Sequence, residues 1–453
     1  MLPSGTRVQW AGLLLGLLVI LTSNSCSTYS KSFRRMEEKL AQQKPAQALE
    51  ILEKQSHPDR DKLLYLLNKA MLLRLTNDYA GSNAEFEKAK NLIQYLSAAS
   101  VTEKASSFVI NDATRSYEGA AFEQVLVHVY EALNYLDMGD LDAARVEALQ
   151  VDVRLQELAG DDPDSFLSVD PFGRYLTGLI YEELGEWSNA MIAYRKAYEA
   201  YQRHGEHYAV DIPSFLKVDL LRCSEKMGLR QEHERYKKAF EIETWPSPSA
   251  LHRNGELVLL FQNGLAPIKR EKVIRLLDPS SGHLLQVALP CYENRPVSAQ
   301  RACLVVGDKR FCGETMEDIS AIAIKGLEAH LPAIKARALA RAAWRFAAQQ
   351  GFKKKNARKG SKQSGTEAIA SILFNVTTAL VERADTRSWL TLPGEIQMTR
   401  VVLPPGSYKV QIELLNKSGE VIHSDVFDSV RLACRKKTYL SYYWLSSASI
   451  LGD

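Results

Sequence analysis

The chain has 453 residues, a formal net charge of +3 at pH 7 and 46% hydrophobic residues. It contains no Cys-x-x-Cys pair, no Gly-x-Ser-x-Gly and no phosphate-binding glycine loop. The sequence therefore gives no support for a structural zinc site, a thioredoxin-like site, a serine hydrolase or a nucleotide-binding loop. We expect a non-enzymatic protein that needs no cofactor and binds no metal.

The first residues predict export. Trp10 to Leu21 is an apolar run that follows a single basic residue, Arg7, and it is too short to span a bilayer. Small residues then lead to Cys26. We expect a signal peptide over 1–25, a lipid on Cys26 and a short tether over 26–31. Cleavage by an ordinary signal peptidase remains the alternative, because Ser23 and Ser25 also satisfy a small-x-small cleavage site.

The most informative stretch is 171–201, where small and aromatic residues recur at helical spacing. Gly178 and Ala190 lie 12 residues apart, at the points where two helices must approach closely. The same separation recurs upstream, and one upstream step has the 34-residue period of tetratricopeptide repeats. We therefore predict a tetratricopeptide-like helical domain over 32–243. Its expected packing residues are Ala70, Ser82, Phe86, Ala132, Ala144, Gly178, Tyr181, Ala190, Tyr194 and Ala197.

Four helical pairs follow from this pattern, and a divergent fifth is expected between Ile212 and Ile242. Stacked pairs form a concave surface that suits the binding of a peptide or a helix. We expect Asn68, Arg174 and Glu182 to lie in that groove. The generic alternative is a helical bundle whose alanines match by chance.

A proline- and serine-rich linker at 244–249 predicts a boundary, after which runs of β-type residues begin. The expected fold class is α + (α+β): a solenoid followed by a β-rich domain over 250–453, with a helical hairpin inserted at about 316–382. Cys303 and Cys312 flank a predicted hairpin that turns at Gly307 and Asp308. They form either a disulfide or two small buried positions on neighbouring strands.

The inserted region is strongly basic: between Ala329 and Thr366 there are ten Lys or Arg and no Asp or Glu. It reads as a helix interrupted at Pro332, a cationic loop and a short apolar helix at 368–380. The segment either touches an anionic surface such as phospholipid or lipopolysaccharide, or is a solvated loop. Nucleic acid is not an expected partner. The basic residues are Arg337, Arg341, Arg345, Lys353, Lys354, Lys355, Arg358, Lys359 and Lys362.

A second candidate site is Asp385, Arg387 and Trp389, at the entry of a strand predicted over 388–392. An Asp–Arg pair can hold a polar ligand, and a tryptophan can stack on a sugar or a cation. The alternative is a buried ion pair and a core tryptophan.

Several stretches resemble a family of uncharacterised proteobacterial tetratricopeptide-repeat envelope lipoproteins. They lie in both halves of the mature chain and are 117–119 with 122–123, 128–139 with Glu147, 255–258 with 263–267, and 384–393 (ADTRSWLTLP). The resemblance implies a periplasmic lipoprotein associated with the outer membrane and without an assigned activity, in the company of lipoprotein activators of peptidoglycan synthases.

Together these patterns predict a lipid-anchored periplasmic scaffold, at the outer membrane, that binds an envelope protein or peptide through its repeats. The alternative function is a cell-wall carbohydrate-binding protein or hydrolase that acts through the second half.

Overall fold

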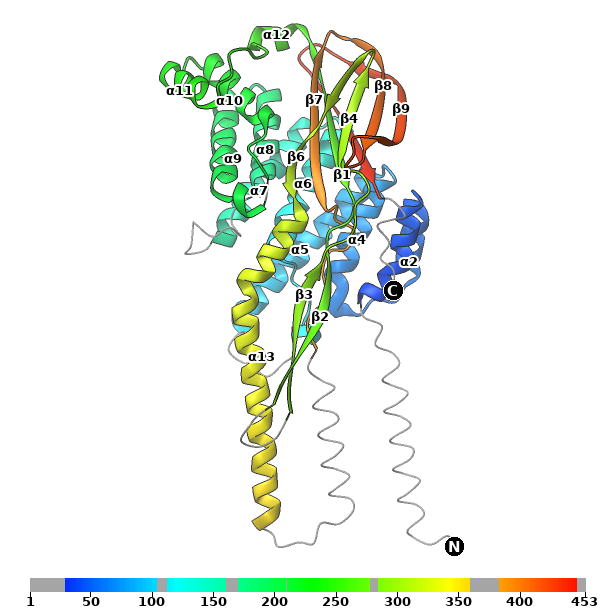
Figure 1. The fold of residues 1–453 in the computed structure, drawn as a ribbon, viewed down its shortest axis with the longest axis vertical. Coiled ribbons are helices and arrows are strands. Elements are labelled where there is room, and N and C mark those ends of the chain that lie inside the picture. The colour runs from blue at the N-terminus through cyan, green and yellow to red at the C-terminus, as the bar shows by residue number, and fades with distance from the viewer. Residues whose placement is uncertain are drawn as a thin grey trace.

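A computed structural model describes residues 29–103, 112–159, 170–208, 210–277, 284–358 and 383–445. The chain begins with helices and continues into strands, with one long helix between two sets of strands (Figure 1). The helices before the first strand are α2 (Tyr29–Ala41), α3 (Pro45–Lys54), α4 (Lys62–Leu75), α5 (Tyr79–Glu103), α6 (Ala121–Met138), α7 (Leu141–Ala159), α8 (Pro171–Glu183), α9 (Trp187–Tyr208), α10 (Ser214–Lys226), α11 (Arg230–Phe240) and α12 (Pro248–Arg253).

Helices α2 to α11 form five successive hairpins, each with a short turn. Gly139, Gly185 and Gly228 end the first helices of three hairpins with φ between 68° and 78°. Glycine adopts this left-handed conformation without a steric penalty, so it stops the helix and lets the chain reverse. Helix α2 begins at Tyr29, inside the expected tether, and Cys26 lies outside the described residues.

The small residues of the repeats lie where two helices meet. A Cβ on Gly178 would stand 2.4 Å from the ring of Tyr194, so only glycine allows α8 and α9 to pack at this distance. Tyr181 is half-buried, at the edge of this contact. The other predicted packing residues are fully or almost fully buried: Ala70, Ser82, Phe86, Ala132, Ala144, Ala190, Tyr194 and Ala197.

The strands form two four-stranded sheets and a separate hairpin. One sheet has the order β10-β1-β7-β6, the other β5-β4-β8-β9, and β2 pairs with β3. Strand β1 is parallel to β10 and antiparallel to β7. The strands are β1 (Gly255–Asn263), β2 (Ile268–Leu277), β3 (Leu284–Glu293), β4 (Arg301–Val306), β5 (Lys309–Cys312), β6 (Glu314–Asp318), β7 (Glu395–Leu403), β8 (Gly406–Leu415), β9 (Val421–Leu432) and β10 (Lys437–Trp444).

Strand β1 is buried on both faces and shows how the layers are arranged. Leu257, Leu259 and Phe261 pack in the core between the two sheets. Val258 and Leu260 point to the opposite face and belong to the core formed with the helices. Since side chains alternate along a strand, the β10-β1-β7-β6 sheet is sandwiched between the helical array and the other sheet. The helical and β-rich regions therefore share one hydrophobic core.

Cys303 and Cys312 occupy facing positions on β4 and β5 and are joined by a disulfide. The expected hairpin turns at Gly307, which has a φ of 59°. The strand predicted over 388–392 was wrong, because these residues form a turn and irregular backbone.

The inserted segment begins with β6, and one helix follows, α13 (Ile319–Arg358). The expected break at Pro332 was wrong, since Pro332 lies inside this 40-residue helix. A proline removes one backbone hydrogen bond and can be tolerated as a kink when the helix continues on both sides. The apolar stretch at 368–380 lies outside the described residues.

Helix α13 runs far beyond the helical and sheet layers, and the β2–β3 hairpin lies beside its first part (Figure 1). Val287 and Leu289 of β3 pack on Ala338, with Ile274 and Ile334 at the edge of this small core. We call α13 together with β2 and β3 the arm. Within the described part of the chain, no helix is both long and apolar enough to cross a membrane.

Candidate functional site

The inner face of the helical array is covered by a later segment of the same chain. Trp389 is 1% exposed and meets the rings of Phe86 and Tyr130 edge-on, with centroids 5.8 and 6.0 Å away. Its backbone N–H donates to a carboxylate oxygen of Glu123 at 2.7 Å. Aromatic contacts of this geometry stabilise a core beyond the area that they bury. Trp389 is therefore a core anchor, which favours the core-tryptophan alternative over a ligand-stacking role.

The residues on either side of Trp389 are also held by the helices. Thr391 donates from its backbone N–H to Asn68 at 3.2 Å, so this predicted groove residue binds the protein itself. Arg387 forms ion pairs with Asp385 at 2.8 Å and with Asp61 at 3.0 Å. The Arg387 side chain is only 7% exposed. Its ion pairs with Asp385 and Asp61 therefore hold this segment against the helices and leave no open site for a polar ligand.

A second set of buried charges joins the helices to the sheet. Arg400 of β7 pairs with Asp219 of α10 and with Glu256 of β1, and Arg222 pairs with Asp219 and Glu182 at 2.6 Å each. Burial opposes ionisation, but the surrounding cations, Arg222 foremost, hold the pKa of Glu182 at about 2. Buried charges persist only when they are paired in this way. Glu182 is thus part of the interface, and its expected place in an open groove was wrong.

The third predicted groove residue, Arg174, lies elsewhere. Its guanidinium is 3.4 Å from a carboxylate oxygen of Asp152, in a contact between α8 and α7. Farther along the array, Arg74 of α4 pairs with Asp137 of α6 at 2.8 Å and donates to Ser441 of β10. Contacts of this kind run from the second hairpin to the fifth. Along these contacts the structure thus brings the groove and the sheet together.

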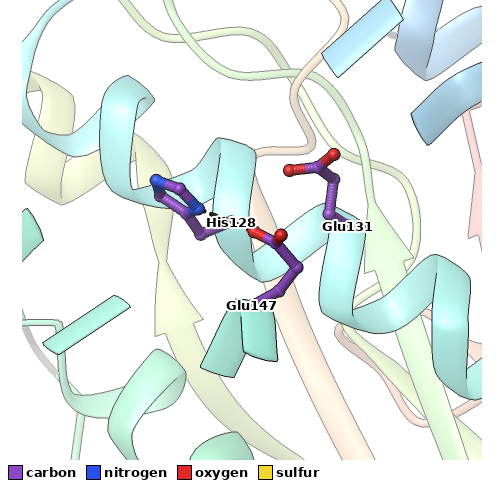
Figure 2. Close-up of side chains that lie close together, drawn as sticks. All are labelled: His128, Glu131 and Glu147. Atoms are coloured by element: carbon purple, nitrogen blue, oxygen red, sulfur yellow. Dashed lines mark hydrogen bonds and ion pairs between the residues drawn. The ribbon is translucent and has the colours of Figure 1, made fainter. Parts of the chain in front are cut away.

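A histidine and two glutamates converge between helices α6 and α7 (Figure 2). His128 Nδ1 lies 2.8 Å from Glu147, and the ammonium of Lys90 lies 2.7 Å from Glu131 and 3.0 Å from Glu147. Burial raises the pKa of Glu131 to about 9, and the charge of Glu147 adds to this effect. Imidazole and carboxylate groups suit a transition metal. Here the Lys90 ammonium already lies between the two acidic side chains.

Sequence reasoning missed this cluster. The only local signal is that His128 and Glu131 are three residues apart and so share a helical face. Lys90 and Glu147 come from other helices, and no spacing rule places them on that face, although Glu147 accompanies 128–139 in the family resemblance.

The predicted basic residues all belong to α13 or to the residues that follow it. Arg337 is exposed, whereas Arg341 is only 6% exposed. Arg341 therefore does not lie on an open cationic face. The backbone of α13 carries Arg345, Lys353, Lys354, Lys355 and Arg358, whereas Lys359 and Lys362 lie outside the described residues.

Three solved structures illustrate what the chain is similar to. They are the apo form of RapI (14% identity, TM-score 0.34, 49% of this chain and 56% of that one), MamA AMB-1 (17%, 0.27, 47% and 89%) and the Rap conjugation gene regulator of the plasmid pLS20 in complex with the Phr* peptide (13%, 0.28, 47% and 53%). The chain spans about half the length of RapI and of the Rap regulator. No family model matches the chain, and no curated protein is significantly similar to it. At these TM-scores the matches assign neither a family nor a function.

Proposed function

We propose that the protein is a non-enzymatic lipoprotein scaffold of the bacterial cell envelope, tethered through a lipid on Cys26, at the outer membrane. The observation that carries the proposal is the arm, which projects from a body whose inner helical face is already filled (Figure 1). Such a body has little inner surface left to bind a partner, so we place its partner contacts on the outer surface. A link to outer-membrane or peptidoglycan biogenesis rests on the family resemblance alone.

The arm suits an anionic surface because of its charge. Helix α13 has no acidic residue after Glu328, whereas its last turns contain three consecutive lysines, Lys353 to Lys355, and Arg358. Each Lys or Arg near an anionic membrane contributes about 1 kcal/mol to binding. We therefore assign the tip of the arm to phosphate-bearing lipid, either phospholipid or lipopolysaccharide.

The partner protein is assigned to the exposed side of α7 and α9. Val146, Leu149 and Val153 are 53%, 51% and 39% exposed and follow one another at helical spacing on α7. Ile192 of the neighbouring α9 is 49% exposed. We call these four residues the outer ridge. A row of apolar side chains at this spacing suits the apolar face of an amphipathic helix from an envelope protein.

The membrane contact is tested with the full mature chain and vesicles that contain anionic lipid. Replacing Lys353, Lys354 and Lys355 together by Gln should weaken vesicle binding by about 3 kcal/mol, roughly 100-fold, and added salt should reduce the difference. A control with the same charge change on the body is the triple Gln variant of Lys238, Lys309 and Lys417, which are exposed. Equal binding by the two triple variants would contradict the assignment.

The protein contact is tested by cross-linking in envelope preparations. The Leu149→Asp/Val153→Asp variant should lose an adduct that the native chain forms, whereas Tyr95→Asp, at an isolated exposed residue of α5, should keep it. If both variants keep every adduct, the outer ridge is not the docking surface. Mass spectrometry of the mature N-terminus tests the lipid on Cys26 independently.

A further inference from the structure

A cleft of about 210 Å³ lies where the helices meet the sheet. One wall comes from the turn before α9 and the end of α10, another from α12, and a third from the turn between β9 and β10. Its walls include Trp187, Lys226, Leu251, His252, Arg435 and Lys436. Pockets for drug-sized ligands are usually about 300–1,000 Å³, so this cleft is suited to a smaller molecule.

The carboxylates of the cleft are already satisfied by the protein. Glu182 and Glu256 each form an ion pair at 2.6 Å with a buried arginine. Glu183 accepts hydrogen bonds from the backbone N–H of Lys437 at 3.0 Å and from the hydroxyl of Tyr439 at 3.3 Å. The arginines neutralise Glu182 and Glu256, whereas the two hydrogen bonds satisfy the oxygens of Glu183 without removing its charge.

The cations of the walls are placed differently. Arg435 and Lys436 are exposed, and among the described residues neither has a carboxylate within ion-pair distance. Lys226 lies over the ring of Trp187, 5.7 Å from its centroid, and likewise has no acidic partner in the described part of the chain. Three wall cations against the single remaining carboxylate of Glu183 leave the cleft with an excess of positive charge, beside an aromatic and an aliphatic wall.

We infer that this cleft binds a single-ring organic anion, namely a sugar that carries a carboxylate or a phosphate. Lys226, Arg435 and Lys436 would pair with the acid group, since charge-assisted contacts to such groups are the strongest that a partly exposed site can form. The ring would lie along Trp187 and Leu251, and the amide of Asn254 could bond a hydroxyl. The site is separate from the arm and from the outer ridge, so it does not depend on the proposed function.

The test uses isothermal titration of the full mature chain with four probes. Glucuronate and glucose 6-phosphate carry the ring with a carboxylate or a phosphate, glucose carries the ring alone, and inorganic phosphate carries the anion alone. We expect at least one of the two acidic sugars to bind at least about tenfold more tightly than glucose and inorganic phosphate. Comparing the two acidic sugars identifies which acid group the cleft prefers.

Two variants locate the binding. Lys226→Gln/Lys436→Gln should lower the affinity for the preferred acidic sugar by about tenfold or more, whereas Lys417→Gln, in the exposed turn between β8 and β9, should leave it unchanged. Trp187→Leu should weaken the acidic sugars but not inorganic phosphate, with folding checked by thermal unfolding. The inference is overturned if no probe binds saturably at millimolar concentration, if glucose binds as tightly as both acidic sugars, or if the double variant binds like the native chain.

Discussion

The inner face of the helical array and the arm both concentrate positive charge, but they hold it in opposite ways. On the inner face, Arg222, Arg387 and Arg400 are almost fully buried, and each is paired with carboxylates from other elements. On the arm, α13 has no acidic residue after Glu328. Buried charges that are paired across elements hold the architecture together, whereas we assign the consecutive lysines at the end of α13 to contacts outside the chain.

Removing an inner-face charge should have the largest effect. Arg400→Ala leaves Asp219 and Glu256 buried without this partner, which should lower the free energy of unfolding by about 3–5 kcal/mol. Arg145→Ala is the matched control, because Arg145 pairs with Glu186 at the surface and such pairs contribute about 1 kcal/mol or less. Denaturant unfolding measures both. Similar losses in the two variants would mean that burial does not distinguish these pairs.

The pH dependence of stability tests a buried acidic group, Glu131, within the helices. The pKa of Glu131 is raised from 4.5 to about 9, so the folded state keeps a proton that the unfolded state releases. The stabilising contribution of this group is complete below its unfolded pKa and is lost as pH rises through about 9. Glu131→Gln should remove that loss, which amounts to at most about 1.4 kcal/mol per pH unit.

Thermal unfolding across this pH range checks the effect. Glu157→Gln, at an exposed position of α7, should follow the native chain. If the Glu131→Gln variant loses stability as steeply as the native chain, Glu131 is not the group that titrates.

The smallest effect on stability is expected at the tip of the arm. Replacing Lys353, Lys354 and Lys355 by Gln should change the free energy of unfolding by less than about 0.5 kcal/mol, as for most surface substitutions. The same variant should lose vesicle binding, so stability and binding separate. A loss of stability comparable to that of Arg400→Ala would show that the tip packs against the body and is no arm.

Local patterns carried the part of the fold that could be predicted from the sequence. The spacing of Gly178 and Ala190 fixes how two adjacent helices meet, and glycine marks the turns, so the hairpins follow from neighbouring residues. Polar and apolar residues alternate over 407–414, a pattern that predicts a half-buried strand, and these residues lie in β8.

The rest depends on contacts between residues far apart in the chain. Trp389 and Glu123 are 266 residues apart, and no periodic pattern in the sequence indicates that they are in contact. The prediction of an open groove failed for this reason: Asn68 and Glu182 have the polarity of groove residues, but their partners come from the same chain. At Pro332 a local signal was the source of the error. Proline predicts a break in the helix, but α13 continues on both sides of it.

The parallel pairing of β1 with β10 has a consequence for biosynthesis. Strand β1 ends at Asn263, but its neighbour β10 begins only at Lys437, and the segment that covers the helices is also made late. Until these residues are in place, the helices have no cover for their apolar side. Chains truncated before β10 should therefore aggregate.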